Sequence, residues 1–236
     1  MALAIAPSFM SANLLHVEDE IRALEPIADF FHVDIIDWHY VKNMCLTPQF
    51  IRAMHSATTV PIDAHLYVDN VDDELVQLCL DSGAGIITMP ADVIGRSVHR
   101  FAHRIHSAGA LVGIFLNPSQ PVETVLPYAE VIDHLLLMSV DPGFGGQDFI
   151  PATYDRIRTA CNLRENLGLN YRIVIDGNCN ADRFHSLAEA GADALCLGRG
   201  LFDCDPDTRR AGELTAQAIN AINAELKLNS IVASTR

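Results

Sequence analysis

The sequence alternates eight times between a short apolar or β-branched run and a longer amphipathic segment, and this alternation limits the folds open to the chain. Short apolar runs are typical of strands buried on both faces, and the segments between them have helical spacing of their apolar residues. The eight expected strands are residues 3–8, 30–36, 61–68, 85–90, 110–117, 134–140, 171–176 and 194–198. Eight successive βα units predict an α/β fold, the (β/α)8 TIM barrel.

Glycines mark the ends of four expected helices, within SGAG, SAGA, LGLN and EAGA, where a left-handed residue lets the chain turn into the next strand. No linker rich in Gly, Ser or Pro separates the units, so residues 1–226 are expected to form one barrel domain and residues 227–236 a loose C-terminal tail. A doubly wound open sheet is the alternative. The loop after the first strand lacks the G-x-G-x-x-G pattern of that fold, which favours the barrel.

The charge balance restricts the partners that the chain can bind. Asp and Glu number 30 against 16 Lys and Arg, a formal charge of −14, which argues against nucleic acid or an anionic membrane as a partner. The six cysteines form no C-x-x-C pair, which favours reduced thiols and a cytoplasmic location. No apolar run approaches the length of about 18 residues that a membrane-spanning helix needs.

Polar residues gather at the carboxyl ends of the expected strands, where barrels of this type hold their active sites. His32 and Asp34 point to one side of the second strand because side chains alternate along a strand. His65 and Asp176 would add a second imidazole and a second carboxylate around one divalent ion, with zinc expected first and Mn²⁺, Fe²⁺ or Co²⁺ as alternatives. A single His-x-Asp pair is more often a hydrogen-bonded core feature, so the convergence of three strands favours the metal.

Three glycine-bearing loops follow the last three expected strands, with the sequences DPGFGGQ (141–147), DGN (176–178) and GRG (198–200). Glycines allow backbone N–H groups to approach a phosphate closely, and phosphate-binding barrels commonly hold the anion after strands seven and eight. The first loop alone is equally typical of an ordinary Pro/Gly turn. Arg199 has two alternatives, a contact with the phosphate or an ion pair with Asp203 or Asp205.

Several motifs occur together in one order and spacing: APS (6–8), HVDIID (32–37), DAHL (63–66), SVDPGFGGQDFIP (139–151) and IDGNCN (175–180). On these motifs the chain resembles the ribulose-phosphate 3-epimerase family of phosphate-binding barrels, from about residue 4 to residue 203. The sequences LTPQF (46–50), LNP (116–118), NCN (178–180) and GLF (200–202) are most similar to the D-allulose-6-phosphate 3-epimerase branch.

The resemblance implies an enzyme that inverts carbon three of a ketose phosphate, D-allulose 6-phosphate or D-ribulose 5-phosphate. Asp34 and Asp176 would act as acid and base through a metal-stabilised enediolate, and they would bind the metal together with His32 and His65. The implied substrate-binding residues are Ser8, His65, Met138, Asp141, Gly143, Gly145, Gly146, Gly177, Asn178, Gly198 and Arg199. A symmetric homo-oligomer, a dimer or larger, is also implied.

Some positions depart from the family's pattern. Trp38 stands where Gly is usual, Tyr67 where Met is usual, Met89 where His is usual and Lys42 where Pro is usual. These changes leave the expected ligands and both proton-transfer groups in place. Two alternatives remain open: a diverged sugar-phosphate-binding barrel without turnover, and an aldolase or decarboxylase on the same scaffold, although neither of the chain's two lysines ends a strand.

Overall fold

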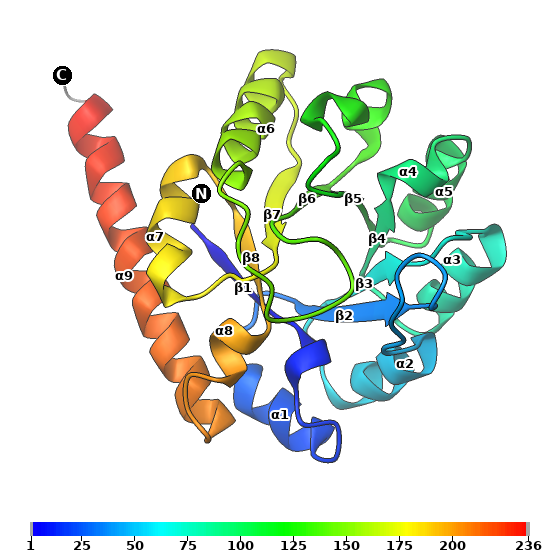
Figure 1. The fold of residues 1–236 in the computed structure, drawn as a ribbon, viewed down its shortest axis with the longest axis horizontal. Coiled ribbons are helices and arrows are strands. Elements are labelled where there is room, and N and C mark those ends of the chain that lie inside the picture. The colour runs from blue at the N-terminus through cyan, green and yellow to red at the C-terminus, as the bar shows by residue number, and fades with distance from the viewer. Residues whose placement is uncertain (1, 235–236) are drawn as a thin grey trace.

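The computed structural model describes residues 2–234 and contains eight parallel strands arranged as a barrel with helices on the outside (Figure 1). The strands are β1 (Ala4–Pro7), β2 (Phe31–Ile36), β3 (Ile62–Tyr67), β4 (Ile86–Pro90), β5 (Leu111–Leu116), β6 (His134–Met138), β7 (Arg172–Asp176) and β8 (Ala194–Leu197). Parallel pairing runs in sequence order from β2 to β8 and then to β1. A bridge between Ser8 and His32 joins β1 to β2. The predicted (β/α)8 barrel is confirmed.

Helical segments connect the strands and cover the outside of the barrel (Figure 1). The α-helices are α1 (Val17–Leu24), α2 (Pro48–Ala57), α3 (Asp73–Asp81), α4 (Ala91–Ile94), α5 (Val98–Ser107), α6 (Thr153–Leu167), α7 (Ala181–Ala190), α8 (Arg199–Phe202) and α9 (Thr208–Ser234), and the 3-10 helices are η1 (Phe9–Ser11) and η2 (Val122–Val131). The four glycines expected to end helices all have positive φ. Among residues 2–234, no helix is both long and apolar enough to cross a membrane.

One helix differs from its expected type. Residues 122–132 have the apolar spacing of an α-helix, but η2 is a 3-10 helix broken at Tyr128, where φ is −141°. Pro127 lies inside this segment and has no N–H to donate to the preceding turn. The proline explains why a helical pattern of apolar residues does not produce an α-helix here.

Residues 227–234 of the expected C-terminal tail continue α9 as far as Ser234, and residues 235 and 236 lie outside the described part. No glycine or proline occurs after Gly212, so nothing in the sequence stops α9 once it has begun. The helix is also attached to the barrel. Asn223 accepts a hydrogen bond from the N–H of Leu3 at 2.7 Å and donates one to its carbonyl at 3.2 Å.

The core has two parts, one between the strands and the helices and one inside the barrel. The inner part contains small side chains on neighbouring strands, such as Ala4 and Ala6 on β1 and Ala194 on β8. Tyr67 and Met138 lie in the same inner part, towards the carboxyl ends of β3 and β6. The carboxyl end of the barrel therefore combines apolar packing with the polar residues of the candidate site.

Three aspartates fix neighbouring strands at the opposite, amino-terminal end of the barrel. Asp29, Asp133 and Asp193 come shortly before β2, β6 and β8, and a carboxylate oxygen of each accepts a backbone N–H at 2.8 Å. The donors are Ile5, Val112 and Ile173. Each aspartate thereby sets the register of two adjacent strands far from the candidate site.

Replacing Asp193 should destabilise the fold. Asp193 and Arg164 form an ion pair in which both side chains are largely buried. Asp193→Asn leaves the guanidinium of Arg164 without its counter-charge, so we expect the free energy of unfolding to fall by about 3 kcal/mol. Urea denaturation measures this change.

The matched control is Asp155→Asn, because Asp155 pairs with Arg158 in an exposed position. Loss of an exposed pair should change the free energy of unfolding by less than about 1 kcal/mol. Equal effects of the two variants would contradict the structural role assigned to Asp193.

Candidate active site

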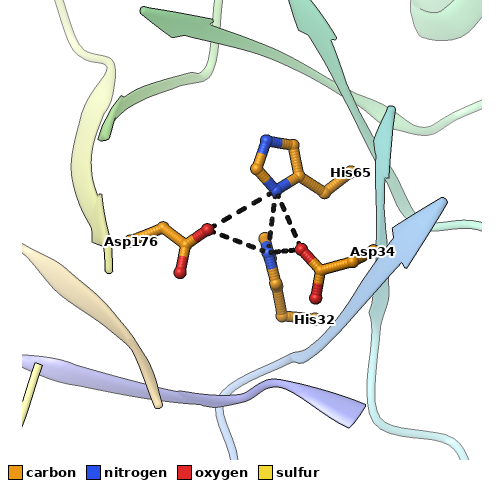
Figure 2. Close-up of side chains that lie close together, drawn as sticks. All are labelled: His32, Asp34, His65 and Asp176. Atoms are coloured by element: carbon orange, nitrogen blue, oxygen red, sulfur yellow. Dashed lines mark hydrogen bonds and ion pairs between the residues drawn. The ribbon is translucent and has the colours of Figure 1, made fainter. Parts of the chain in front are cut away.

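Four polar side chains meet at the carboxyl end of the barrel (Figure 2). His32 and Asp34 come from β2, His65 from the neighbouring β3 and Asp176 from the end of β7. The Nε2 atom of His32 lies 2.9 Å from Nδ1 of His65 and 3.3 Å from Oδ1 of Asp34, and each of these two nitrogens lies 3.8 Å from Oδ2 of Asp176. One ligand atom from each residue lies within 4.8 Å of the others. The structure thus brings together all four residues predicted to bind a metal.

The local sequence explains this convergence. Val33 separates His32 from Asp34, so both side chains point into the barrel from one strand. Asp34 pairs in register with His65 on β3, which places the second imidazole beside the first carboxylate. Asp176 is the last residue of β7 and pairs with Cys196 on β8.

The donor atoms suit a divalent cation. Ligand bonds of about 2.0–2.2 Å in a tetrahedral site place neighbouring ligands about 3.3–3.6 Å apart. The two imidazole nitrogens lie 2.9 Å apart, and each lies 3.3 to 3.8 Å from a carboxylate oxygen of Asp34 and of Asp176, on either side of that value. Two imidazole nitrogens facing each other need either a shared proton or a cation. Two imidazoles and two carboxylates are ligands that zinc and other first-row metals accept.

A second layer of polar side chains holds His32. The Nδ1 atom of His32 lies 2.9 Å from Oδ2 of Asp63, and the hydroxyl of Thr88 donates to Oδ1 of Asp63 at 2.7 Å. A proton on Nδ1, donated to Asp63, leaves the lone pair of Nε2 directed at the cluster. Gly113 on β5 makes room for this arrangement, because a Cβ at that position would lie 2.2 Å from the hydroxyl oxygen of Thr88.

Asp63 and Thr88 have no assigned role in the sequence-based prediction. Asp63 is buried, and although burial raises the pKa of its carboxyl, the hydrogen bond and charge of His32 bring that pKa below its ordinary value. The available signal was strand alternation, since Asp63 and His65 share one face of β3 just as His32 and Asp34 share one face of β2.

The two carboxyls of the cluster have different acidities. Burial opposes ionisation of Asp34, but the charges and hydrogen bonds of His32 and His65 lower its pKa overall. Burial raises the pKa of Asp176, where His32 opposes the rise and the nearby charge of Asp34 adds to it. Each carboxyl also receives one neutral hydroxyl: Ser8 donates to Oδ2 of Asp34 at 2.8 Å, and Tyr67 donates to Oδ2 of Asp176 at 3.2 Å. The two carboxyls thus lie in different surroundings, and each is oriented by one hydroxyl.

A cavity of about 770 Å³ opens beside this cluster. Ten of the predicted substrate-binding residues line it, namely Ser8, Met138, Asp141, Gly143, Gly145, Gly146, Gly177, Asn178, Gly198 and Arg199. His65, the remaining predicted substrate-binding residue, is not among the described residues that line the cavity; it is fully buried, with its Nδ1 directed at the cluster. The Nε2 atom of His65 is buried and has no hydrogen-bond partner within residues 2–234.

The glycine-bearing loops pack closely against one another. Gly177 has a φ of +115°, and a Cβ there would lie 2.7 Å from a methyl carbon of Val140. A Cβ on Gly200 would lie 1.9 Å from the backbone oxygen of Cys179, so the loop after β8 touches the backbone of the loop after β7. Arg199 forms the ion pair that was one of its two alternatives, since its Nε donates to Asp203 at 2.8 Å, and it also lines the cavity.

Comparisons with known proteins identify the family. A family model described as the ribulose-phosphate 3 epimerase family matches residues 4–202. The chain belongs to the ribulose-phosphate 3-epimerase family. Its relatives include the ribulose-phosphate 3-epimerase of Mycobacterium leprae, 35% identical over 225 residues that cover 91% of this chain and 98% of the relative. The ribulose-phosphate 3-epimerase of Escherichia coli is 36% identical over 208 residues, covering 87% of this chain and 91% of the relative.

Membership in the ribulose-phosphate 3-epimerase family makes the chain an enzyme of the isomerase class that epimerises carbon three of a ketose phosphate. Solved structures share the barrel. KGPDC from Streptococcus mutans has a TM-score of 0.73 at 10% identity and covers 93% of this chain and 98% of its own. A 3-hexulose-6-phosphate synthase has a TM-score of 0.70 at 10% identity and covers 92% of this chain and 99% of its own. At this identity the likeness shows the fold alone.

A methyl group on Gly177 should impair the epimerase. Gly177→Ala places a Cβ on a residue with a left-handed conformation, which costs about 1–3 kcal/mol. The backbone must then shift next to Asp176. We expect kcat/KM to fall at least about tenfold, since small misplacements of a reacting group have large effects on rate. Steady-state kinetics with a ketose phosphate measures the change.

Gly168→Ala is the matched control. Gly168 ends α6 with a φ of +64°, but a Cβ there would meet nothing within 4 Å. The variant should lose about 1 kcal/mol of stability and keep wild-type kinetics. Wild-type kinetics in Gly177→Ala as well would contradict the importance of this turn.

Proposed function

We propose that the chain is a metal-dependent 3-epimerase whose preferred substrate is D-allulose 6-phosphate, with D-ribulose 5-phosphate as the second candidate. The observation that carries the proposal is the meeting of two carboxyls from β2 and β7 with two imidazoles in one cluster. The sequences LTPQF, LNP, NCN and GLF favour the allulose branch of the family. We further propose a cytoplasmic location, on the absence of C-x-x-C pairs among the six cysteines, and a homo-oligomer, a dimer or larger, on the same resemblance.

Inversion of a carbon beside a ketone needs a proton removed from one face and another returned to the opposite face. Figure 2 shows the carboxyls of Asp34 and Asp176 on opposite sides of the two imidazoles. In the proposed mechanism one of them takes the proton of carbon three while the other, protonated, donates to the far face.

His32, Asp34, His65 and Asp176 would hold the divalent ion, zinc first and Mn²⁺, Fe²⁺ or Co²⁺ as alternatives. When bound there, the ion would supply positive charge that stabilises negative charge developing on the substrate's oxygens. The hydroxyl of Ser8 fixes the second oxygen of Asp34 and can contact the substrate from β1. The protein side chains thus orient both acid–base groups.

The loops at the other side of the cavity would bind the phosphate. Backbone N–H groups around Gly145, Gly146, Gly177 and Gly198 can approach an anion without a Cβ in the way. Arg199 would add a positive charge to this side of an otherwise acidic protein. Binding the phosphate away from carbon three orients the reacting carbon between the carboxyls.

Deuterium incorporation tests the reaction and the substrate together. Wild-type protein incubated in D₂O with D-allulose 6-phosphate or D-ribulose 5-phosphate should place deuterium at carbon three, faster with the former. Asp176→Asn should lose at least about a hundredfold in turnover, because a positioned acid or base contributes about a hundred- to ten-thousand-fold. NMR spectroscopy of the sugar phosphate follows both inversion and exchange.

Asp155→Asn, an exposed change on α6, is the control and should keep wild-type turnover. An Asp176→Asn protein that keeps most of its turnover would reject the two-carboxyl scheme. Binding of the sugar phosphates without any exchange by the wild type would instead favour a barrel that binds and does not turn over.

Removal of the metal should abolish turnover. After dialysis against a chelator we expect loss of exchange, with recovery on addition of Zn²⁺, Mn²⁺, Fe²⁺ or Co²⁺. Asp63→Asn should need about 10- to 100-fold more metal for half-maximal recovery, because Asp63 orients His32. Activity titrations and elemental analysis of the protein give both quantities, and full turnover by protein free of metal would contradict the proposal.

A further inference from the structure

Tyr67 lies beside the four clustered residues and also lines the cavity. It ends β3, two residues after His65, and its ring is buried while its side chain reaches the cavity. Its hydroxyl lies 3.2 Å from Oδ2 of Asp176 and 3.2 Å from the sulfur of Met138. The hydroxyl is therefore placed to donate a hydrogen bond to one of the two acid–base carboxyls.

Packing fixes the position of the Tyr67 ring. Its centroid lies 4.2 Å from that of His65, 5.2 Å from that of Phe115 and 6.2 Å from that of Tyr40. Tyr40 is itself held, because Asn117 donates to its hydroxyl oxygen at 2.6 Å. A ring enclosed on several sides has little rotamer freedom, so the hydroxyl it carries is fixed in space.

Asp176 has little other support from its own strand. It is the last residue of β7, and Gly177 and Asn178 after it have φ values of +115° and +49°. Within residues 2–234, Tyr67 donates the one side-chain hydrogen bond that Asp176 receives, and Ser8 donates a hydroxyl hydrogen bond to Asp34. The two carboxyls are thus each oriented by one neutral hydroxyl from a neighbouring strand or from across the barrel.

We infer that Tyr67 is a positioning residue that holds Oδ2 of Asp176 for ligand binding and for proton transfer at carbon three. The inference rests on the proposed function and adds a group that the family's usual methionine at this position cannot supply, since a thioether has no proton to donate. Loss of a hydrogen bond to a charged group of this kind corresponds to about a 10- to 100-fold decrease in rate or in metal affinity. Tyr67 itself exchanges no proton with the substrate in this scheme.

Tyr67→Phe tests the inference, because it keeps the ring and removes only the hydroxyl. We expect kcat to fall about 10- to 100-fold with KM within about threefold of wild type. Affinity for Zn²⁺, measured by competition with a chromogenic chelator, should fall about tenfold because Asp176 is less well held. Tyr171→Phe is the matched control, since it removes a buried hydroxyl that donates to Ala160 outside the site, and it should change neither quantity.

Exchange in D₂O identifies which half of the reaction is affected. If only the Asp176 step is slowed, an epimer that has been deprotonated by Asp34 is more often reprotonated by Asp34 before it is inverted. The recovered starting epimer should then contain more deuterium per turnover than with the wild type. The other epimer, which is deprotonated by Asp176, should be recovered with less deuterium per turnover than with the wild type. A purely structural defect would not move these two ratios in opposite directions.

Opposite shifts of the two ratios together with weaker Zn²⁺ binding support the role of Tyr67. Unchanged ratios, ratios that shift in the same direction, or wild-type affinity for Zn²⁺ overturn it. Thermal unfolding of Tyr67→Phe establishes that the variant is folded, and Tyr67→Met, which also lacks the hydroxyl, replaces it if it is not. Failure of the proposed function is a separate result, seen as absence of exchange at carbon three in the wild type.

Discussion

The structure depends on how two carboxyls and two imidazoles are kept together in the mouth of an apolar barrel. Buried charges are unfavourable unless they are paired or hydrogen-bonded, and His32, Asp34 and His65 are almost completely buried. Each group therefore has a partner beyond the cluster or faces a place where a cation fits. Ser8 supports Asp34, Tyr67 supports Asp176, and Asp63 supports His32. The site is a network whose members come from strands far apart in sequence.

The barrel makes this network possible by fixing strand register at both ends. At the carboxyl end, pairing places Asp34 beside His65 and Met138 beside Asp176. At the amino-terminal end, Asp29, Asp133 and Asp193 bind backbone N–H groups of adjacent strands. A shift by one residue would turn every inward side chain outward, so these distant contacts protect the geometry of the cluster.

The sequence was sufficient to predict the barrel and the four clustered residues, because strand alternation and the known place of barrel active sites are local rules. It was not sufficient for contacts between strands. The strand positions of Asp63 and Tyr67 indicate which face of β3 each occupies. Their hydrogen-bond partners on other strands, His32 and Asp176, depend on register and ring packing. The 3-10 conformation at Pro127 and the length of α9 were missed because apolar spacing does not distinguish helix types or predict where a helix stops without a breaker.

Gly113 shows how far the requirements of the site extend. It lies on β5, pairs in register with Thr88, and lacks the side chain that would displace the threonine hydroxyl from Asp63. Asp63 in turn determines which nitrogen of His32 is unprotonated. Gly113 lies three strands away from His32, yet its lack of a Cβ supports the hydrogen bonds that favour one tautomer of this candidate ligand. Side chains at the cavity rim can change without touching this contact, whereas any Cβ at Gly113 would collide with Thr88.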